Sequence, residues 1–332
     1  MLIQSSFKPA WWLPNGHIQT LYPALLRQPG SPITIKRERL LTPDNDFIDI
    51  DWCGEKNKAL VILLHGLTGS SKSSYISGLQ KTLLKNGLRS VVLNFRGCSG
   101  EPNYLARGYH SGDTGDIHFL YQTIRQREPD TSIAVIGFSL GGNVLLKWLG
   151  EYAHKLSLNA AVAVSVPLVL AECATRLDSG FSKIYRHNLI QGLITYIQNK
   201  QRYLEKIGAD HEADKIKQLG DLSAIKSFWQ YDDQVVAQLH GFRDVHHYYQ
   251  QSSSRQYLHK INTATLIIQS RDDPFMTPDI LPTNEELSSS VTLEVTEHGG
   301  HLGFISGNNP LKPIYWLENR IVDFLQKNQT AV

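Results

Sequence analysis

Residues 132–143 read Ser-Ile-Ala-Val-Ile-Gly-Phe-Ser-Leu-Gly-Gly-Asn, an apolar run that ends at Gly137 and leads into an amphipathic segment. The run before Gly137 suits a buried parallel strand, and apolar residues recur at helical spacing over residues 144–149. The turn contains Gly-x-Ser-x-Gly around Ser139, in which small residues let the chain turn sharply and expose the hydroxyl. For this stretch alone, the alternative is a glycine-rich turn with an incidental serine.

The composition is typical of a soluble globular protein, with 41% apolar and 19% charged residues in a chain of 332. This length allows one large α/β domain with an insertion, or two domains of ordinary size. The formal net charge of +2, without any run of like charges, lacks the basic field that a nucleic-acid partner requires.

The sequence predicts neither export nor a membrane span. Residues 1–13 lack a basic stretch followed by an apolar one, so they do not form a signal peptide. The longest apolar run, residues 160–171, is too short to cross a bilayer. Three cysteines are far apart and match no metal spacing, which favours free thiols in a reducing compartment: Cys53, Cys98 and Cys173. We therefore expect a cytoplasmic protein, and leave its oligomeric state open.

From residue 59 onward, apolar strands alternate with glycine-marked loops and amphipathic helices. Strands are expected at 60–64, 90–95, 160–166, 265–270 and 291–295, and helices at 73–85, 114–127 and 314–326. This alternation predicts an α/β fold with a mostly parallel central sheet, of about eight strands, covered by helices on both faces. Upstream, segments 33–41 and 47–52 flank a turn and predict an antiparallel hairpin.

The strand–helix alternation stops over residues 167–258, which contain helical patches and many aromatic residues. We interpret this segment as a helical cap over the carboxyl ends of the strands, where open α/β sheets hold their sites. The core then comprises residues 31–166 and 259–332. Residues 1–30, rich in aromatic residues and proline, are expected to pack on that core as an arm.

Candidate partners for Ser139 follow two later strands. A serine hydroxyl needs a base to take its proton, and the base needs a carboxylate to orient it. Asp272 and Asp273 follow one expected strand, and His298 and His301 follow the next, all at the same edge of the sheet as Ser139. We prefer Asp273, which directly precedes a turn proline, and His301, which glycines surround; Asp272 and His298 remain alternatives.

Two backbone N–H groups are expected to stabilise the oxyanion of such a reaction. One belongs to Leu140, directly after the nucleophile, and the other to Leu67 in the loop His-Gly-Leu-Thr-Gly that follows an early strand. His65 is expected to order this loop rather than to catalyse. Residues 66–73 also approach a phosphate-binding loop, but Ser71 stands where the second glycine is required, which disfavours nucleotide hydrolysis.

No cofactor is indicated by the sequence. The histidine pairs 298/301 and 246/247 have no Glu or Cys at ligand spacing, which argues against a metal site. The dinucleotide fingerprint Gly-x-Gly-x-x-Gly does not occur.

Taken together, the chain resembles the YheT-type α/β-hydrolases, a family that includes medium-chain acyl esterases and acyltransferases. The resemblance runs nearly end to end and implies that Ser139 is the nucleophile, Asp273 the acid and His301 the base. One departure is the cap segment 228–233, so substrate contacts transfer least well. The resemblance is carried by six segments in order: 7–20, 65–69, 94–100, 137–143, 272–275 and 299–304.

The expected activity is hydrolysis of small-molecule esters with short to medium acyl chains, through an acyl-enzyme on Ser139. One alternative is an acyltransferase, in which an alcohol replaces water as the acceptor. The other is an inactive protein of this fold that acts as a binding module, which the complete set of candidate residues disfavours.

Overall fold

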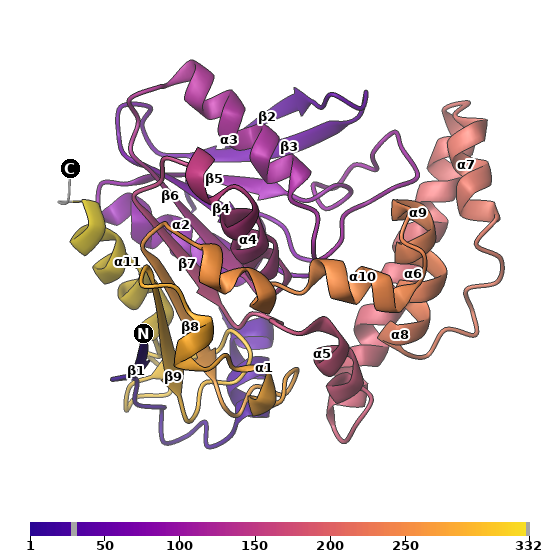
Figure 1. Cartoon of the computed structure of the whole chain (residues 1–332). Helices are drawn as coiled ribbons and strands as arrows, with labels where there is room; N and C mark the ends of the chain where they lie inside the picture. Colours follow the sequence, from indigo (N-terminus) through magenta and orange to yellow (C-terminus); the bar gives the residue numbers. More distant parts are fainter. Residues whose placement is uncertain (28–31, 330–332) are drawn as a thin grey trace.

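A nine-stranded sheet forms the centre of the protein in the computed structural model, which describes residues 1–27 and 32–329 (Figure 1). Among the described strands of this sheet, β3 alone runs in the direction opposite to the others. In spatial order the strands are β1 (Leu2–Gln4), β9 (Val291–Thr296), β8 (Thr265–Ser270), β7 (Ala160–Val164), β6 (Ile133–Phe138), β4 (Leu60–Leu64), β5 (Arg89–Asn94), β3 (Phe47–Cys53) and β2 (Lys36–Leu41). The antiparallel hairpin and the mostly parallel sheet expected from the sequence are both confirmed.

The ninth strand comes from the N-terminal arm. β1 pairs in parallel with β9, so that Leu2 lies opposite Leu293 and the first residues extend the sheet edge. A strand of three residues is too short to show a period, which explains why the sequence did not predict it. The arm continues into α1 (Gly16–Leu26), whose N-cap Asn15 accepts a hydrogen bond from the Ile18 N–H. The expected end of the arm at residue 30 lies outside the described residues.

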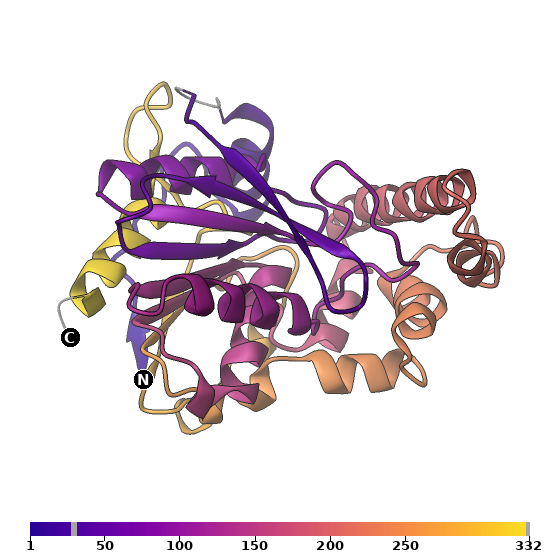
Figure 2. The ribbon, with the colours of Figure 1, turned by 90° about the horizontal axis from the view of Figure 1, so that it is seen from above.

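Helices cover both faces of the sheet, as the alternation predicts (Figures 1 and 2). One face carries α2 (Ser74–Lys85) and α11 (Trp316–Gln329), and the other carries α3 (Gly115–Arg127) and α4 (Leu140–Glu151). Each face has its own apolar core, because strands such as β4 and β6 are buried on both sides.

Short elements complete this core. The last helix begins two residues later than expected, because residues 314 and 315 pair as β11 (Ile314–Tyr315) with β10 (Ile305–Ser306). Four 3₁₀ turns lie in the connections: η1 (Ala153–Lys155), η3 (Arg255–Lys260), η4 (Pro278–Ile280) and η5 (Asn284–Glu286). Of these, η3 packs on α4.

Residues 170–252 form a separate layer of helices that we call the cap. The cap lies at the end of the molecule opposite α11 (Figure 2). It has an apolar core of its own. Its elements are α5 (Leu170–Leu177), α6 (Ser182–Lys206), α7 (Asp210–Lys217), α8 (Phe228–Tyr231), the π-helix η2 (Asp232–Ala237), α9 (Gln238–His240) and α10 (Val245–Ser252). No helix within the described ranges has the length and hydropathy needed to cross a membrane.

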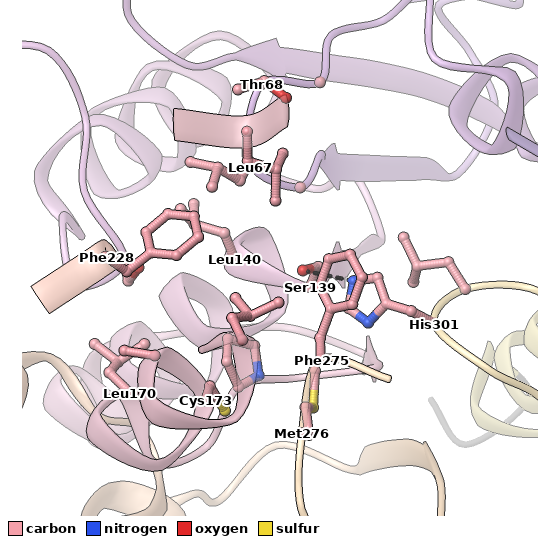
Figure 3. Close-up of a pocket in the computed structure, with 18 of the residues that line it drawn as sticks. Leu67, Thr68, Ser139, Leu140, Leu170, Cys173, Phe228, Phe275, Met276 and His301 are labelled. Carbon is pink, nitrogen blue, oxygen red and sulfur yellow. Dashed lines mark hydrogen bonds between the residues drawn. The ribbon is translucent and has the colours of Figure 1, made fainter. Parts of the chain in front are cut away.

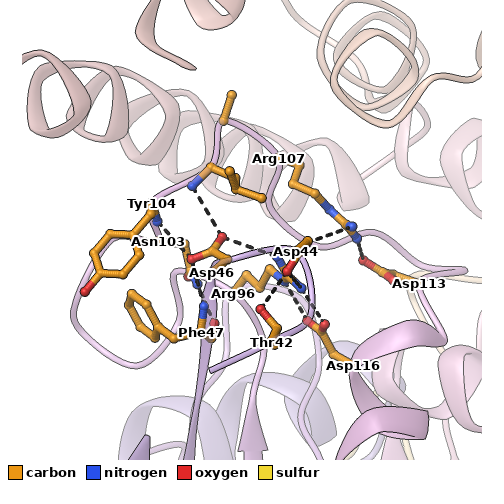
Figure 4. A network of polar contacts seen from close by, with 12 residues as sticks. Thr42, Asp44, Asp46, Phe47, Arg96, Asn103, Tyr104, Arg107, Asp113 and Asp116 are labelled. Carbon is orange, nitrogen blue, oxygen red and sulfur yellow. Dashed lines mark hydrogen bonds and ion pairs between the residues drawn. The ribbon is translucent and has the colours of Figure 1, made fainter. Parts of the chain in front are cut away.

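A buried ion network fixes the long connection between β5 and α3 (Figure 4). The Arg96 side chain, only 3% exposed, pairs with Asp44 at 2.8 Å and Asp46 at 3.3 Å in the β2–β3 turn, and with Asp116 at 2.7 Å in the first turn of α3. Burial raises the pKa of the Asp116 carboxyl. The network therefore connects the β2–β3 turn, the segment after β5 and the start of α3. These segments meet beside the residues that lead to Tyr109.

Replacing Arg96 by methionine would leave the Asp46 and Asp116 carboxylates buried without their cation. We expect the free energy of unfolding, measured by urea denaturation, to fall by about 3–5 kcal/mol. The control is Arg127→Met, which removes a 2.7 Å pair with Glu38 in which Arg127 is 46% exposed. Its loss should stay below about 1 kcal/mol. Equal losses for the two variants would contradict the structural role of Arg96.

Candidate active site

The loops that carry the predicted residues meet at one edge of the sheet. Leu64 lies opposite Gly137, Phe138 lies opposite Val164, and Val164 lies opposite Ile268. Because these parallel strands end nearly level, the segments that follow them emerge side by side. The structure thus brings the Ser139 turn, the Asp273 loop and the Leu67 loop to one place, and the His301 loop follows β9 to the same edge (Figure 3).

The turn at Ser139 has a backbone that few residues adopt. Ser139 has φ 51° and ψ −120°, and its N–H donates to the Val164 carbonyl at 2.8 Å. A Cβ atom at Gly137 would lie 2.4 Å from the Gly141 carbonyl oxygen, and one at Gly141 would lie 2.4 Å from the His65 carbonyl oxygen. The two glycines of the motif are therefore required by close packing of the α4 N-terminus on the neighbouring strand ends.

The predicted serine, histidine and acid form one hydrogen-bonded chain. The His301 Nε2 lies 3.0 Å from the Ser139 Oγ, and the His301 Nδ1 lies 2.8 Å from the Asp273 Oδ2. The other Asp273 oxygen accepts the Phe275 N–H at 2.8 Å, and the Phe275 ring stacks on the imidazole with centroids 4.2 Å apart. The serine, histidine and aspartate thus have the order of contacts that a nucleophile, its base and an orienting carboxylate require.

The structure also distinguishes Asp273 and His301 from the alternatives Asp272 and His298. Asp272 Oδ1 accepts the Gly300 N–H at 2.9 Å, and its Oδ2 lies 3.4 Å from the exposed His298 ring. Asp272 therefore holds the histidine loop, whereas Asp273 contacts His301 itself. Neither Asp272 nor His298 is placed in the chain that ends at Ser139.

The N-terminal arm supports the histidine loop, a contribution that the sequence did not predict. The loop is strained, since Leu302 has φ 61° and Phe304 has φ 46°. The His301 N–H donates to Thr20 Oγ1 at 2.8 Å, and the Gln19 side chain accepts from the Ile305 N–H at 2.8 Å. These contacts join positions more than 280 residues apart. The segment 7–20 carried a family resemblance, but no local pattern linked it to the site.

Two half-buried tyrosines shape the loop that contains Leu67. The Gly66 N–H donates to the Tyr75 hydroxyl at 2.8 Å, and the Thr68 N–H donates to the Tyr109 hydroxyl at 2.9 Å. Burial raises the pKa of Tyr75 to about 12, so its phenol stays protonated at neutral pH. Within the described structure the Leu67 N–H has no protein acceptor. It lies between the N–H groups of Gly66 and Thr68, which both donate to a tyrosine hydroxyl.

This loop also touches the nucleophile. A Cβ atom on Gly66 would lie 3.2 Å from the Ser139 Cβ. His65 is buried below the loop, where its Nε2 accepts the Phe95 N–H at 3.0 Å and its Nδ1 lies 2.7 Å from the Gly66 carbonyl oxygen. Burial lowers the pKa of His65 to about 4. With both ring nitrogens engaged, His65 orders the loop and has no free atom for proton transfer to a substrate.

A cavity of about 340 Å³ opens between the site and the cap. Ser139 and His301 line one side of it, and Leu67 and Leu140 line it as well (Figure 3). Most of the remaining wall is apolar and comes from the cap and the acid loop: Leu170, Cys173, Ala174, Leu177, Leu189, Phe228, Phe275 and Met276. A chamber of this character binds an apolar group next to the serine.

One group of side chains in the described residues has the composition of a metal site. Ligand atoms of His110, Asp113 and His240 lie within 4.8 Å of one another. However, the Gly112 N–H donates to His110 Nδ1 at 3.1 Å, which occupies that nitrogen and leaves the proton of the neutral ring on Nε2. Asp113 is already paired with Arg107 at 2.7 Å. These contacts do not fit a metal ion.

Comparisons with known proteins agree with this geometry. Residues 59–308 match a family model described as the alpha/beta hydrolase fold. The chain is 38% identical over 325 residues to YheT of Escherichia coli (strain K12), which is named an esterase, covering 97% of this chain and 93% of YheT. It is 27% identical to phospholipase ABHD3 of Homo sapiens, covering 95% of this chain and 77% of that protein.

Among solved structures, the Pyrococcus furiosus esterase Pf2001 is similar with a TM-score of 0.58. The alignment covers 89% of this chain and 91% of that one at 19% sequence identity, so it bears on the fold alone.

Removing the hydroxyl of Tyr75 or Tyr109 should make the position of the Leu67 N–H less fixed, while the N–H itself remains. We expect Tyr75→Phe and Tyr109→Phe each to lower kcat on a p-nitrophenyl ester by about tenfold, with KM little changed, because an oxyanion donor acts mainly in the transition state. Tyr121→Phe is the control, since the Tyr121 hydroxyl accepts the Ser157 N–H in a buried position far from the site. Parental kcat in both loop variants would refute this role.

Proposed function

The chain belongs to the α/β-hydrolase family as a carboxylic ester hydrolase, and we propose that Ser139, His301 and Asp273 are its catalytic triad. The observation that carries this proposal is the unbroken chain of contacts of 3.0 Å and 2.8 Å from the Ser139 hydroxyl through the imidazole to the Asp273 carboxylate. The strained backbone of Ser139 supports it further, because such strain collects at functional positions.

In the proposed mechanism, His301 takes the proton of the Ser139 hydroxyl as the oxygen attacks the ester carbonyl. Asp273 orients the imidazole and stabilises its positive form. The N–H groups of Leu67 and Leu140 hold the oxyanion of the tetrahedral intermediate. His301 then gives its proton to the leaving alcohol, and a water molecule activated by the same histidine hydrolyses the acyl-enzyme.

Replacing the nucleophile tests this assignment directly. We expect Ser139→Ala to lower kcat on the order of 10⁴-fold or more, because the members of a triad act as a unit. A fluorophosphonate probe should label the parent and Ser179→Ala equally, since Ser179 lies on the exposed surface of the cap. Labelling of Ser139→Ala as strong as that of the parent would show that another residue is the nucleophile.

We further propose that the substrates are esters of short to medium acyl chains. The apolar wall of the 340 Å³ cavity supports this, because it offers a dry surface to an acyl chain next to Ser139. The relatives named esterase and phospholipase are compatible with such a substrate. A cytoplasmic location, which the sequence favours, stays a prediction.

The chain-length preference can be measured with p-nitrophenyl esters from acetyl to dodecanoyl. Each buried methylene contributes about 0.8 kcal/mol, so kcat/KM should rise by up to about fourfold per methylene until the cavity is filled. We expect a maximum at a medium chain length. A steady fall from acetyl onward would refute the acyl-pocket assignment while leaving the triad untouched.

A further inference from the structure

A single carboxyl group interrupts the apolar wall of the ester pocket. Asp232 is the first residue of the π-helix η2 and lines both the 340 Å³ cavity that contains Ser139 and a neighbouring one of about 90 Å³. It therefore stands where the two cavities meet beneath the cap. π-Helical segments of this kind are rare and occur often at functional sites.

The Asp232 carboxyl has few partners for its position. Its Oδ2 accepts a hydrogen bond from the Tyr249 hydroxyl at 2.7 Å. Its Oδ1 accepts none from the described residues, and Tyr249 is the one side chain among them that is found to bond this carboxyl. Burial raises the pKa of Asp232 to about 7. Asp232 is half-buried in the walls of the two cavities, so its second oxygen is open to a hydrogen bond from a ligand that enters them.

The neighbouring residue Asp233 has a structural role instead. Asp233 is exposed, and its Oδ1 accepts the Val245 N–H at 2.9 Å at the start of α10. Its carboxylate thus satisfies a helix N-terminus, whereas the free oxygen of Asp232 belongs to the cavity. Two neighbouring aspartates therefore have different environments, and only the first lines the ester pocket.

We propose that Asp232 and Tyr249 form a polar subsite of the ester pocket that binds a hydroxyl group of the substrate. This inference rests on the proposed function, since the subsite acts on the ester held at Ser139. The hydroxyl lies away from the scissile carbonyl, either on the acyl chain or on the alcohol part. Asp232 is thus a residue that determines specificity, and it takes no part in the chemistry at Ser139.

A hydroxyl fits this subsite better than an ammonium group. The hydroxyl can donate to the free oxygen when Asp232 is ionised and accept from it when Asp232 is protonated, so both forms present at neutral pH can bind it. An ammonium group pairs only with the ionised form. It would also have to lose its hydration inside an apolar cavity, which disfavours burial of an ion pair.

Matched ester pairs test the subsite in the intact protein. The first pair is a 1-monoacylglycerol and the propyl ester of the same acid, and the second is p-nitrophenyl 8-hydroxyoctanoate and p-nitrophenyl octanoate. We expect the parent to prefer the hydroxylated member of one pair by about 10- to 100-fold in kcat/KM, because the bound analogue would cover the Asp232 carboxyl without offering it a hydrogen bond. The pair that shows the preference identifies which part of the substrate carries the hydroxyl.

Variants assign the preference to its residue. In Asp232→Leu the ratio of the two kcat/KM values should fall to near one, and in Asp232→Asn, which keeps the shape of the side chain, it should fall part of the way. Asp233→Asn should keep the parental ratio. A parental ratio that persists in the folded Asp232→Leu variant overturns the proposal.

Three further outcomes also overturn it. Equal turnover within both pairs by the parent removes the hydroxyl subsite but leaves the esterase assignment intact. A preference shown only for a trimethylammonioethyl ester over its neutral 3,3-dimethylbutyl analogue replaces the hydroxyl with a cation. If no ester is cleaved and a fluorophosphonate does not label Ser139, the proposed function fails, and the subsite fails with it.

Discussion

The backbone conformation of Ser139 is the constraint on which the other parts of the site depend. A non-glycine residue at φ 51° costs about 1–3 kcal/mol and persists only where its surroundings leave no alternative. Here the Ser139 N–H is tied to β7 through the Val164 carbonyl, and Gly141 packs against the carbonyls that end β4. The sheet therefore holds the serine hydroxyl above its edge, and each partner must approach it there.

The partners reach that edge on loops that the rest of the chain has to stabilise. The arm supplies Thr20 and Gln19 to the histidine loop, and no side chain fits at Gly16, where a Cβ atom would lie 1.9 Å from the Asp272 carbonyl oxygen. On the opposite side, the Arg96 network fixes the connection that carries Tyr109 to the Leu67 loop. Ordering the site thus requires contacts from both ends of the chain.

The core and the cap contribute different things to the pocket. The core supplies the polar atoms near Ser139, which follow from the ends of parallel strands. The cap supplies apolar surface from α5 and α8, together with the single carboxyl of Asp232. In the proposed function, chemistry and selectivity would lie on separate layers, so changes in the cap would not disturb the strained turn at Ser139.

Several features were determined by the sequence alone, because they depend on local patterns. The strand–turn–helix around Ser139 follows from an apolar run, close-packed glycines and helical spacing, and the alternation after residue 59 predicts the parallel sheet. The order of serine, acid and histidine indicated three loops that the structure brings into contact. Position in a loop, however, does not say where a side chain points.

Tertiary structure decided everything that joins distant segments. Only the contacts in the structure distinguish the adjacent carboxylates of Asp272 and Asp273. Asp273 contacts the His301 ring, whereas Asp272 accepts the Gly300 N–H. The roles of Thr20, Tyr75 and Tyr109 have no local signature, because hydrogen bonds across as many as 281 residues leave no period in the sequence. The position of Asp232 in the cavity wall likewise depends on how the cap helices pack, which the sequence does not show.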